Sequence, residues 1–186
     1  MKLVIIEGTD NTGKDTIISK LLEIYPTSTV IHCGKPVTKK YSSQEQDELF
    51  KLYANNIVNK LYDNTHIIIM NRSHIGEYVY GTMYRTRDEI DVADMIEYIN
   101  NILLSREDLD IKYVQLLCTS EKLLHRNEDG KSLSNGNNDL ILEEVEKFKE
   151  IYVHCNIPKK IINVNDGDEF RSRNDIFKDV LKFINE

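Results

Sequence analysis

Residues 2–24 join a short apolar run to a glycine-containing loop and then to an amphipathic segment. The run at 2–6 is rich in β-branched residues, which predicts a buried strand. Gly8, Gly13 and Lys14 follow with the spacing G-x-x-x-x-G-K, and apolar residues then recur with helical periodicity at 17, 18, 21 and 22. A strand, a glycine loop, a lysine and a helix in this order predict a phosphate-binding loop.

The residue types in this loop suit that chemistry. Gly8 and Gly13 permit backbone conformations that a β-carbon forbids, so that the loop amides can converge on a phosphate. The following helix N-terminus adds a partial positive charge, and Lys14 is expected to reach the β- and γ-phosphates of a nucleotide. We expect nucleotide contacts from Gly8, Asn11, Thr12, Gly13, Lys14, Asp15, Thr16 and Lys131.

The position after the lysine departs from the motif. A serine or threonine there ordinarily binds Mg²⁺, whereas this chain has Asp15 followed by Thr16. Three interpretations involve the metal: Asp15 binds it directly or through water, Thr16 binds it instead, or the metal site is weakened. In the fourth interpretation, Asp15 only stabilises the first helical turn through the helix dipole.

Length and composition favour one domain over residues 1–186. The chain has 186 residues, 40% of them hydrophobic, which suffices for a full core. A net charge of −7 argues against a nucleic-acid partner. Cys33, Cys118 and Cys155 lack metal-like spacing and are expected to be buried thiols. Neither a signal peptide nor a long apolar stretch is evident, so we expect a cytoplasmic protein without a membrane partner.

Predicted strands and helices alternate along the chain. The strands cover residues 2–6, 27–33, 66–70, 111–118 and 160–164, and helices after the first cover 44–62, 76–84, 89–104, 120–126, 140–154 and 175–184. Residues 127–138 are polar and predict a mobile loop, and 165–168 predict a turn. This alternation predicts a three-layer α/β/α fold with a parallel sheet, although periodicity does not give the strand order.

Charged and aromatic residues outside the loop supply further candidates. Arg72 follows a buried strand, at the edge of a parallel sheet where ligands bind, and either bridges phosphates or forms a surface ion pair. Arg126 and Lys131 flank the polar loop and either contact a transferring phosphoryl group or are solvated. The aromatic candidates either stack on a base or pack in the core. The candidate acceptor-binding residues are Glu7, Asp10, Lys35, Phe50, Tyr53, Arg72, Glu77 and Tyr80.

Three segments together resemble the thymidylate kinase-like branch of the P-loop kinases, which includes deoxynucleoside kinases. They are IIEGTDNTGKDT, IIIMNRSHIGEYVYG and TSEKLLHRNEDGK, in the order that the family has them. The resemblance implies a five-stranded parallel sheet with the first strand central, use of ATP and Mg²⁺, and a homodimer. It also implies a lid at about 127–138, an acceptor sugar facing Asp10, and catalytic roles for Lys14, Arg72 and Arg126. Asn71 departs from it, because the family has an acid there, and Asp15 is the candidate to replace that acid at the metal.

The leading hypothesis is therefore phosphoryl transfer from ATP to a (deoxy)nucleoside monophosphate. The first alternative is a deoxynucleoside kinase, in which Glu7 is the base that deprotonates a 5′-hydroxyl. A non-catalytic nucleotide-binding module is a third hypothesis. A GTPase is disfavoured, because Asn59-Lys60 is followed by Leu61-Tyr62 and not by the x-Asp of the base-reading motif. The sequence does not specify the base.

Overall fold

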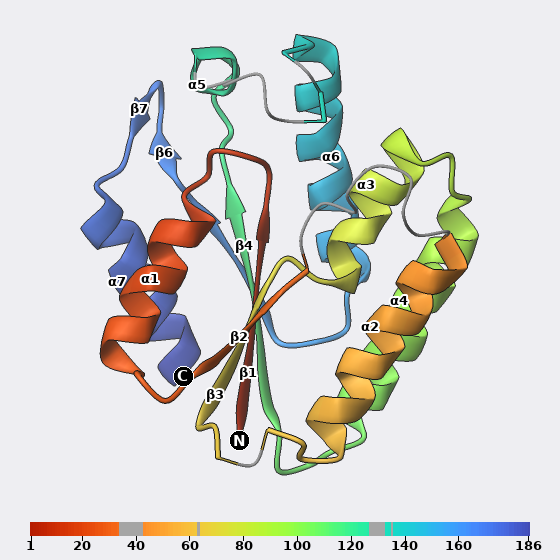
Figure 1. Cartoon of the computed structure of the whole chain (residues 1–186). Coiled ribbons are helices and arrows are strands. Elements are labelled where there is room, and N and C mark those ends of the chain that lie inside the picture. Colours follow the sequence, from red (N-terminus) through yellow and green to blue (C-terminus); the bar gives the residue numbers. More distant parts are fainter. Residues whose placement is uncertain (34–42, 63, 127–132, 135) are drawn as a thin grey trace.

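A five-stranded, all-parallel sheet forms the centre of the computed structural model, which describes residues 1–33, 43–62, 64–126, 133–134 and 136–186. The strand order is β2-β3-β1-β4-β5, so the first strand is central, as the resemblance implies. The strands are β1 (Lys2–Gly8), β2 (Thr29–His32), β3 (Ile67–Asn71), β4 (Asp110–Leu117) and β5 (Lys159–Asn163). The predicted α/β/α class is confirmed (Figure 1).

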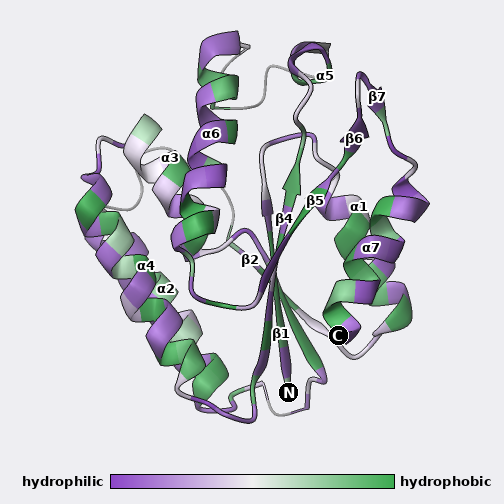
Figure 2. Cartoon of the chain, turned by 180° about the vertical axis from the view of Figure 1, so that it is seen from behind, coloured by the Kyte–Doolittle hydropathy of each residue, from purple (hydrophilic) through white to green (hydrophobic). Residues whose placement is uncertain are grey.

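Helices cover both faces of the sheet. In Figure 1, α1 (Lys14–Ile24) and α7 (Arg173–Asn185) lie on one side, and α2 (Ser43–Val58), α3 (Glu77–Tyr84), α4 (Glu89–Leu104) and α6 (Asn138–His154) lie on the other. Strand β1 serves both layers, since Leu3 and Ile5 join one apolar cluster while Val4 and Ile6 join the other. The hydrophobic strands and the polar outer surfaces of the helices are visible in Figure 2. The alternation of β1 side chains between the two apolar clusters is the period-two pattern expected of a strand buried on both faces.

Local capping explains where two of the longer helices begin. Asp88 accepts hydrogen bonds from the backbone N–H groups of Ile90 and Asp91 and so starts α4. Asn137 does the same for α6, through Asp139 N at 3.0 Å and Leu140 N at 3.4 Å. The helix therefore starts slightly earlier than the predicted residue 140.

The remaining elements are short and come after strands β3, β4 and β5 in the sequence. They are the short helix η1 (His74–Gly76), α5 (Glu121–Arg126), β6 (Asn165–Asp166) and β7 (Glu169–Phe170). β6 and β7 form an antiparallel hairpin where only a turn was predicted, with Gly167 at φ 55° between them. All three cysteines are buried and free. Among the described helices, none is both long and apolar enough to cross a membrane.

Candidate active site

The phosphate loop connects β1 to α1, as the sequence predicts. Gly8 has φ 143°, and a β-carbon there would lie 2.2 Å from the carbonyl oxygen of Leu116 on the neighbouring strand. Gly13 adopts the left-handed conformation, with φ 86° and ψ 20°, directly before the first residue of α1. The close approach of the loop to β4 and the turn into α1 therefore both require glycine.

Lys14 lies folded against the loop that contains it. Its Nζ donates to the carbonyl oxygens of Gly8 at 2.8 Å and Thr9 at 2.6 Å. Burial lowers the pKa of Lys14 to about 8, with a further lowering by Arg72, while Asp10 and other nearby carboxylates oppose the change. A phosphate group bound in the loop would supply the negative charge that this buried ammonium lacks.

Arg72 links the phosphate loop to an aromatic side chain. The residue has φ 64°, and its N–H donates to the Ile6 carbonyl oxygen at 3.0 Å. The guanidinium forms an ion pair with Asp10, and its central carbon lies 4.9 Å from the centre of the Tyr80 ring. Only 16% of the Arg72 side chain is exposed. The backbone turn after β3 and these two contacts therefore hold a cation at the carboxyl edge of the sheet.

A pocket lies on the side of Arg72 away from the phosphate loop. Its described lining residues are Cys33, Gln46, Phe50, Arg72, Ser73, Gly76, Glu77, Tyr80, Arg85 and Leu133. Two predicted aromatic residues, Phe50 and Tyr80, thus line it, whereas Tyr53 packs at the margin of the apolar cluster. Arg85 Nε is buried and has no hydrogen-bond partner among the described residues. The pocket combines the rings of Phe50 and Tyr80 with the charged side chains of Arg72 and Arg85, as expected of a site for a planar polar ring.

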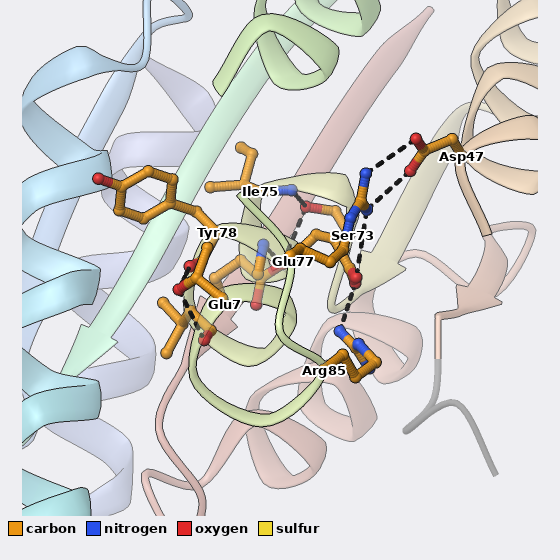
Figure 3. Close-up of polar contacts among 11 residues, drawn as sticks. Glu7, Asp47, Ser73, Ile75, Glu77, Tyr78 and Arg85 are labelled. Carbon is orange, nitrogen blue, oxygen red and sulfur yellow. Dashed lines mark hydrogen bonds and ion pairs between the residues drawn. The ribbon is translucent and has the colours of Figure 1, made fainter. Parts of the chain in front are cut away.

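Glu77 orients the arginines of this pocket. Arg85 donates to its Oε2 at 2.6 Å (Figure 3), and Arg87 donates to its Oε1 at 3.4 Å. Arg87 also binds Asp47 on α2 through two hydrogen bonds of 2.8 and 2.9 Å. Both Glu77 oxygens are engaged and the side chain is 4% exposed, so Glu77 holds the two arginines in place at the pocket. Sequence reasoning missed both arginines, although two cations at a helix junction were a visible signal.

Glu7 is fully buried at the end of β1. Its Oε1 accepts from Ser73 Oγ at 2.9 Å (Figure 3) and from Gly76 N at 3.2 Å. Oε2 has no hydrogen-bond partner in the part of the chain that the structure describes. Burial raises the pKa of Glu7, and the charge of Arg72 opposes that change. A β-carbon on Gly76 would lie 3.0 Å from both Glu7 oxygens, so a side chain there would require the Glu7 carboxyl group to shift slightly.

A second pocket opens over the phosphate loop. It is lined by Thr9, Asp10, Asn11, Thr12, Cys118, Leu123, Leu124, Ser134, Ile141, Glu144 and Phe170. The sequence gave no indication of Glu144, which is buried on α6 and accepts a hydrogen bond from Tyr84 Oη at 2.6 Å. Burial raises the pKa of Glu144 to about 7. Residues of α5, α6 and β7, which come much later in the sequence, thus line a pocket together with the loop.

Asp15 and Asn71 meet beside the phosphate loop. Asn71 Nδ2 donates to Asp15 Oδ1 at 2.8 Å, and His32 Nδ1 lies 3.3 Å from the same amide nitrogen. Thr16 is partly buried in the first turn of α1. An exposed carboxylate suits a hard cation such as Mg²⁺. In the described residues, no group of three or more His, Cys, Asp or Glu side chains forms a metal cage, so such a cation would also need nucleotide oxygens.

The remaining predicted residues cannot be placed in this arrangement. Lys35 and Lys131 lie outside the described residues, as does most of the predicted lid at 127–138. Arg126 ends α5, and its side chain is likewise outside the description. Within the predicted lid segment, Leu133 lines the pocket beside Arg72 and Ser134 lines the pocket over the loop.

Comparisons of the whole fold find P-loop kinases, whereas no protein-family model and no curated protein sequence matches the chain. The YorR protein of Bacillus subtilis, solved with phosphorylated GDP, has a TM-score of 0.68 and 16% identity over 98% of this chain and 95% of its own. Thymidylate kinase of Ehrlichia chaffeensis has a TM-score of 0.61 and 12% identity over 97% of each chain. Deoxyadenosine kinase of M. mycoides has a TM-score of 0.54 and 17% identity over 100% and 99%. The chain thus has the fold of the P-loop nucleotide kinase branch.

Proposed function

We propose that this protein is an ATP-dependent kinase that transfers the γ-phosphoryl group of ATP to a (deoxy)nucleoside monophosphate. The observation that carries the proposal is the position of Arg72. Its guanidinium pairs with Asp10 of the phosphate loop and also lines the pocket that contains Phe50 and Tyr80. One cation therefore borders both a site for the donor phosphates and a site for the acceptor.

Each side of Arg72 has its own task in this mechanism. The loop amides and Lys14 bind the donor phosphates. To do so, Lys14 replaces its hydrogen bonds to two loop carbonyl oxygens with bonds to phosphate oxygens. Phe50 and Tyr80 bind the acceptor base, and Arg72 orients the acceptor phosphate. An acceptor phosphate oxygen bonds to the γ-phosphorus while the bond from that phosphorus to the β–γ bridging oxygen breaks, releasing ADP. Mg²⁺ would neutralise phosphate charge when bound, and Asp15, which directly follows the loop lysine in the sequence, is the carboxylate that would hold it.

The monophosphate is favoured over a nucleoside as acceptor by the environment of Glu7. A nucleoside acceptor needs a base that reaches its hydroxyl group. Glu7 is fully buried, and it is not among the described lining residues of either pocket. A phosphate acceptor is already ionised near neutral pH and does not need this base.

A coupled assay of ADP release, with ATP and a panel of nucleosides and monophosphates, tests the proposal. We expect turnover with at least one monophosphate and none with the matching nucleoside. Turnover with nucleosides alone would favour the nucleoside kinase. ATP binding without turnover on the whole panel would favour the non-catalytic module. We also propose that the active protein is a homodimer, as the family resemblance implies. Light scattering, which measures the molar mass in solution, tests this.

A further inference from the structure

Asp15 and Asn71 come from elements that are distant in sequence and adjacent in space. Asp15 lies in the first turn of α1, and Asn71 is the last residue of β3. Their 2.8 Å hydrogen bond joins residues 56 positions apart. The helix dipole alone accounts for an acid in the first turn, but it does not account for a partner from the sheet.

The residue types at these two positions are exchanged relative to a general pattern. In P-loop NTPases, Mg²⁺ is held by the serine or threonine after the loop lysine and by an aspartate at the end of a nearby strand. Here the carboxylate is on the helix, at Asp15, and a neutral amide ends the strand, at Asn71. The pair keeps one negative charge and a supply of hard oxygen ligands, which is what Mg²⁺ needs.

We propose that the metal ion of the bound nucleotide is held by the Asp15 carboxylate, which Asn71 positions, so that α1 supplies the acidic ligand in place of β3. This inference rests on the proposed nucleotide-binding function. Asp15 is the metal ligand, directly or through water, and Asn71 is a positioning residue.

The hydrogen bonds explain how the carboxylate is fixed. An amide NH₂ group has two hydrogens, and the neighbours of Asn71 Nδ2 are Asp15 Oδ1 and His32 Nδ1. His32 and Asn71 are paired in register at the ends of β2 and β3, so the sheet sets the position of the amide. Asp15 Oδ2 makes no hydrogen bond to a described residue and remains available to a cation. Without a cation, the carboxylate repels nucleotide phosphates.

The test measures how much Mg²⁺ tightens nucleotide binding. Calorimetry gives the Kd of ADP with Mg²⁺ and with EDTA, and the ratio of the two values is the metal enhancement. For Asp15→Asn we expect the enhancement to fall about tenfold or more, while binding in EDTA is unchanged or tighter. For Asn71→Ala we expect a loss of about tenfold, as for other residues that orient metal ligands.

Two further variants make the assignment specific. The double variant Asp15→Ser with Asn71→Asp moves the carboxylate to the strand, and we expect it to recover most of the enhancement. Thr16→Ala should lower the enhancement less than Asp15→Asn does, because Asp15 supplies the metal ligand, and a larger loss in Thr16→Ala would overturn the assignment. Glu23→Gln is the matched control, since Glu23 is an exposed acid on the same helix, about 12 Å further along it.

The outcomes separate this inference from the proposed function. If the wild type binds ADP in neither condition, the proposed function fails. If it binds ADP and Asp15→Asn keeps the full enhancement, the metal assignment is overturned and the kinase proposal stands. Circular dichroism checks folding. Should Asp15→Asn be unfolded, Asn71→Ala and the double variant decide the question, because full enhancement in the first or none in the second overturns the proposal.

Discussion

The phosphate loop and the pocket beyond Arg72 are held together in different ways. The loop owes its shape to Gly8, Gly13 and the hydrogen bonds of Lys14 to carbonyl oxygens five and six residues away. The pocket depends on ion pairs over longer spans, including Arg87 with Asp47, 40 residues apart. A local structure appears in sequence as a motif, whereas a network of this kind does not, because its partners are distant along the chain.

The two regions also differ in the state of their cations. Within the described residues, Lys14 donates only to carbonyl oxygens, and its pKa is lowered, so a phosphate can readily replace those oxygens. Arg85 and Arg87 already share a buried carboxylate. We therefore expect loop substitutions to affect chemistry and pocket substitutions to affect acceptor binding and stability.

The largest effect is expected for Lys14→Ala. Removing the ammonium group from the loop should lower turnover about a hundredfold or more, as for other preorganised charge stabilisers. Steady-state kinetics measures the turnover, and calorimetry should find acceptor binding unchanged. Lys20→Ala, on the same helix and away from the loop, is the control. Wild-type turnover in Lys14→Ala would remove the loop from the active site.

Glu77→Gln should affect the pocket and spare the loop. Because Arg87 keeps Asp47 and Arg85 is partly exposed, we expect a loss of about 2–3 kcal/mol in the free energy of unfolding, below that of a fully buried pair. Monophosphate affinity should also fall, while the Kd of ADP stays constant. Urea unfolding and calorimetry measure these quantities, with the exposed Glu97→Gln as control. Weaker ADP binding would contradict the division.

Arg72→Ala tests the residue shared by the two regions. We expect about a tenfold or greater loss of monophosphate affinity and a smaller loss of ATP affinity, because the guanidinium reaches into the acceptor pocket. Arg72→Lys should recover little, since an ammonium lacks the planar fork. Separate Kd values for both ligands decide this, with Arg173→Ala as the exposed control. Equal losses would make Arg72 a general bridging residue.

The extent of sequence prediction follows the same division. The strand–loop–helix unit, the five strands and the position of Arg72 were predicted, because period-two and helical patterns and a short motif encode them. Glu77 was predicted as a contact, yet its oxygens bind Arg85 and Arg87. Arg85 and Glu144 were missed, because only packing of α3 and α6 brings them to the site. The Asp15–Asn71 bond similarly needed the register of β3 beside β1.

Glu144 provides the most selective test, because this residue lies far from the loop in the sequence and yet lines the pocket over it. Its pKa is about 7 in the folded protein against an ordinary 4.5, so the folded state binds more protons between these values. The stability of the wild type should therefore fall as pH rises from 4.5 to 7. In Glu144→Gln this part of the pH dependence should disappear, a difference of up to about 3 kcal/mol in the free energy of unfolding.

Thermal unfolding between pH 4.5 and 8 measures this difference. The matched control is Glu143→Gln, which removes an exposed carboxylate from the neighbouring position of α6 and should retain the wild-type slope. Parallel curves for wild type and Glu144→Gln would mean that Glu144 ionises normally, with its carboxylate accommodated by Tyr84 and the nearby cations. A flatter curve for Glu144→Gln alone would show that the region over the loop also depends on a long-range contact, which limits the division to the loop itself.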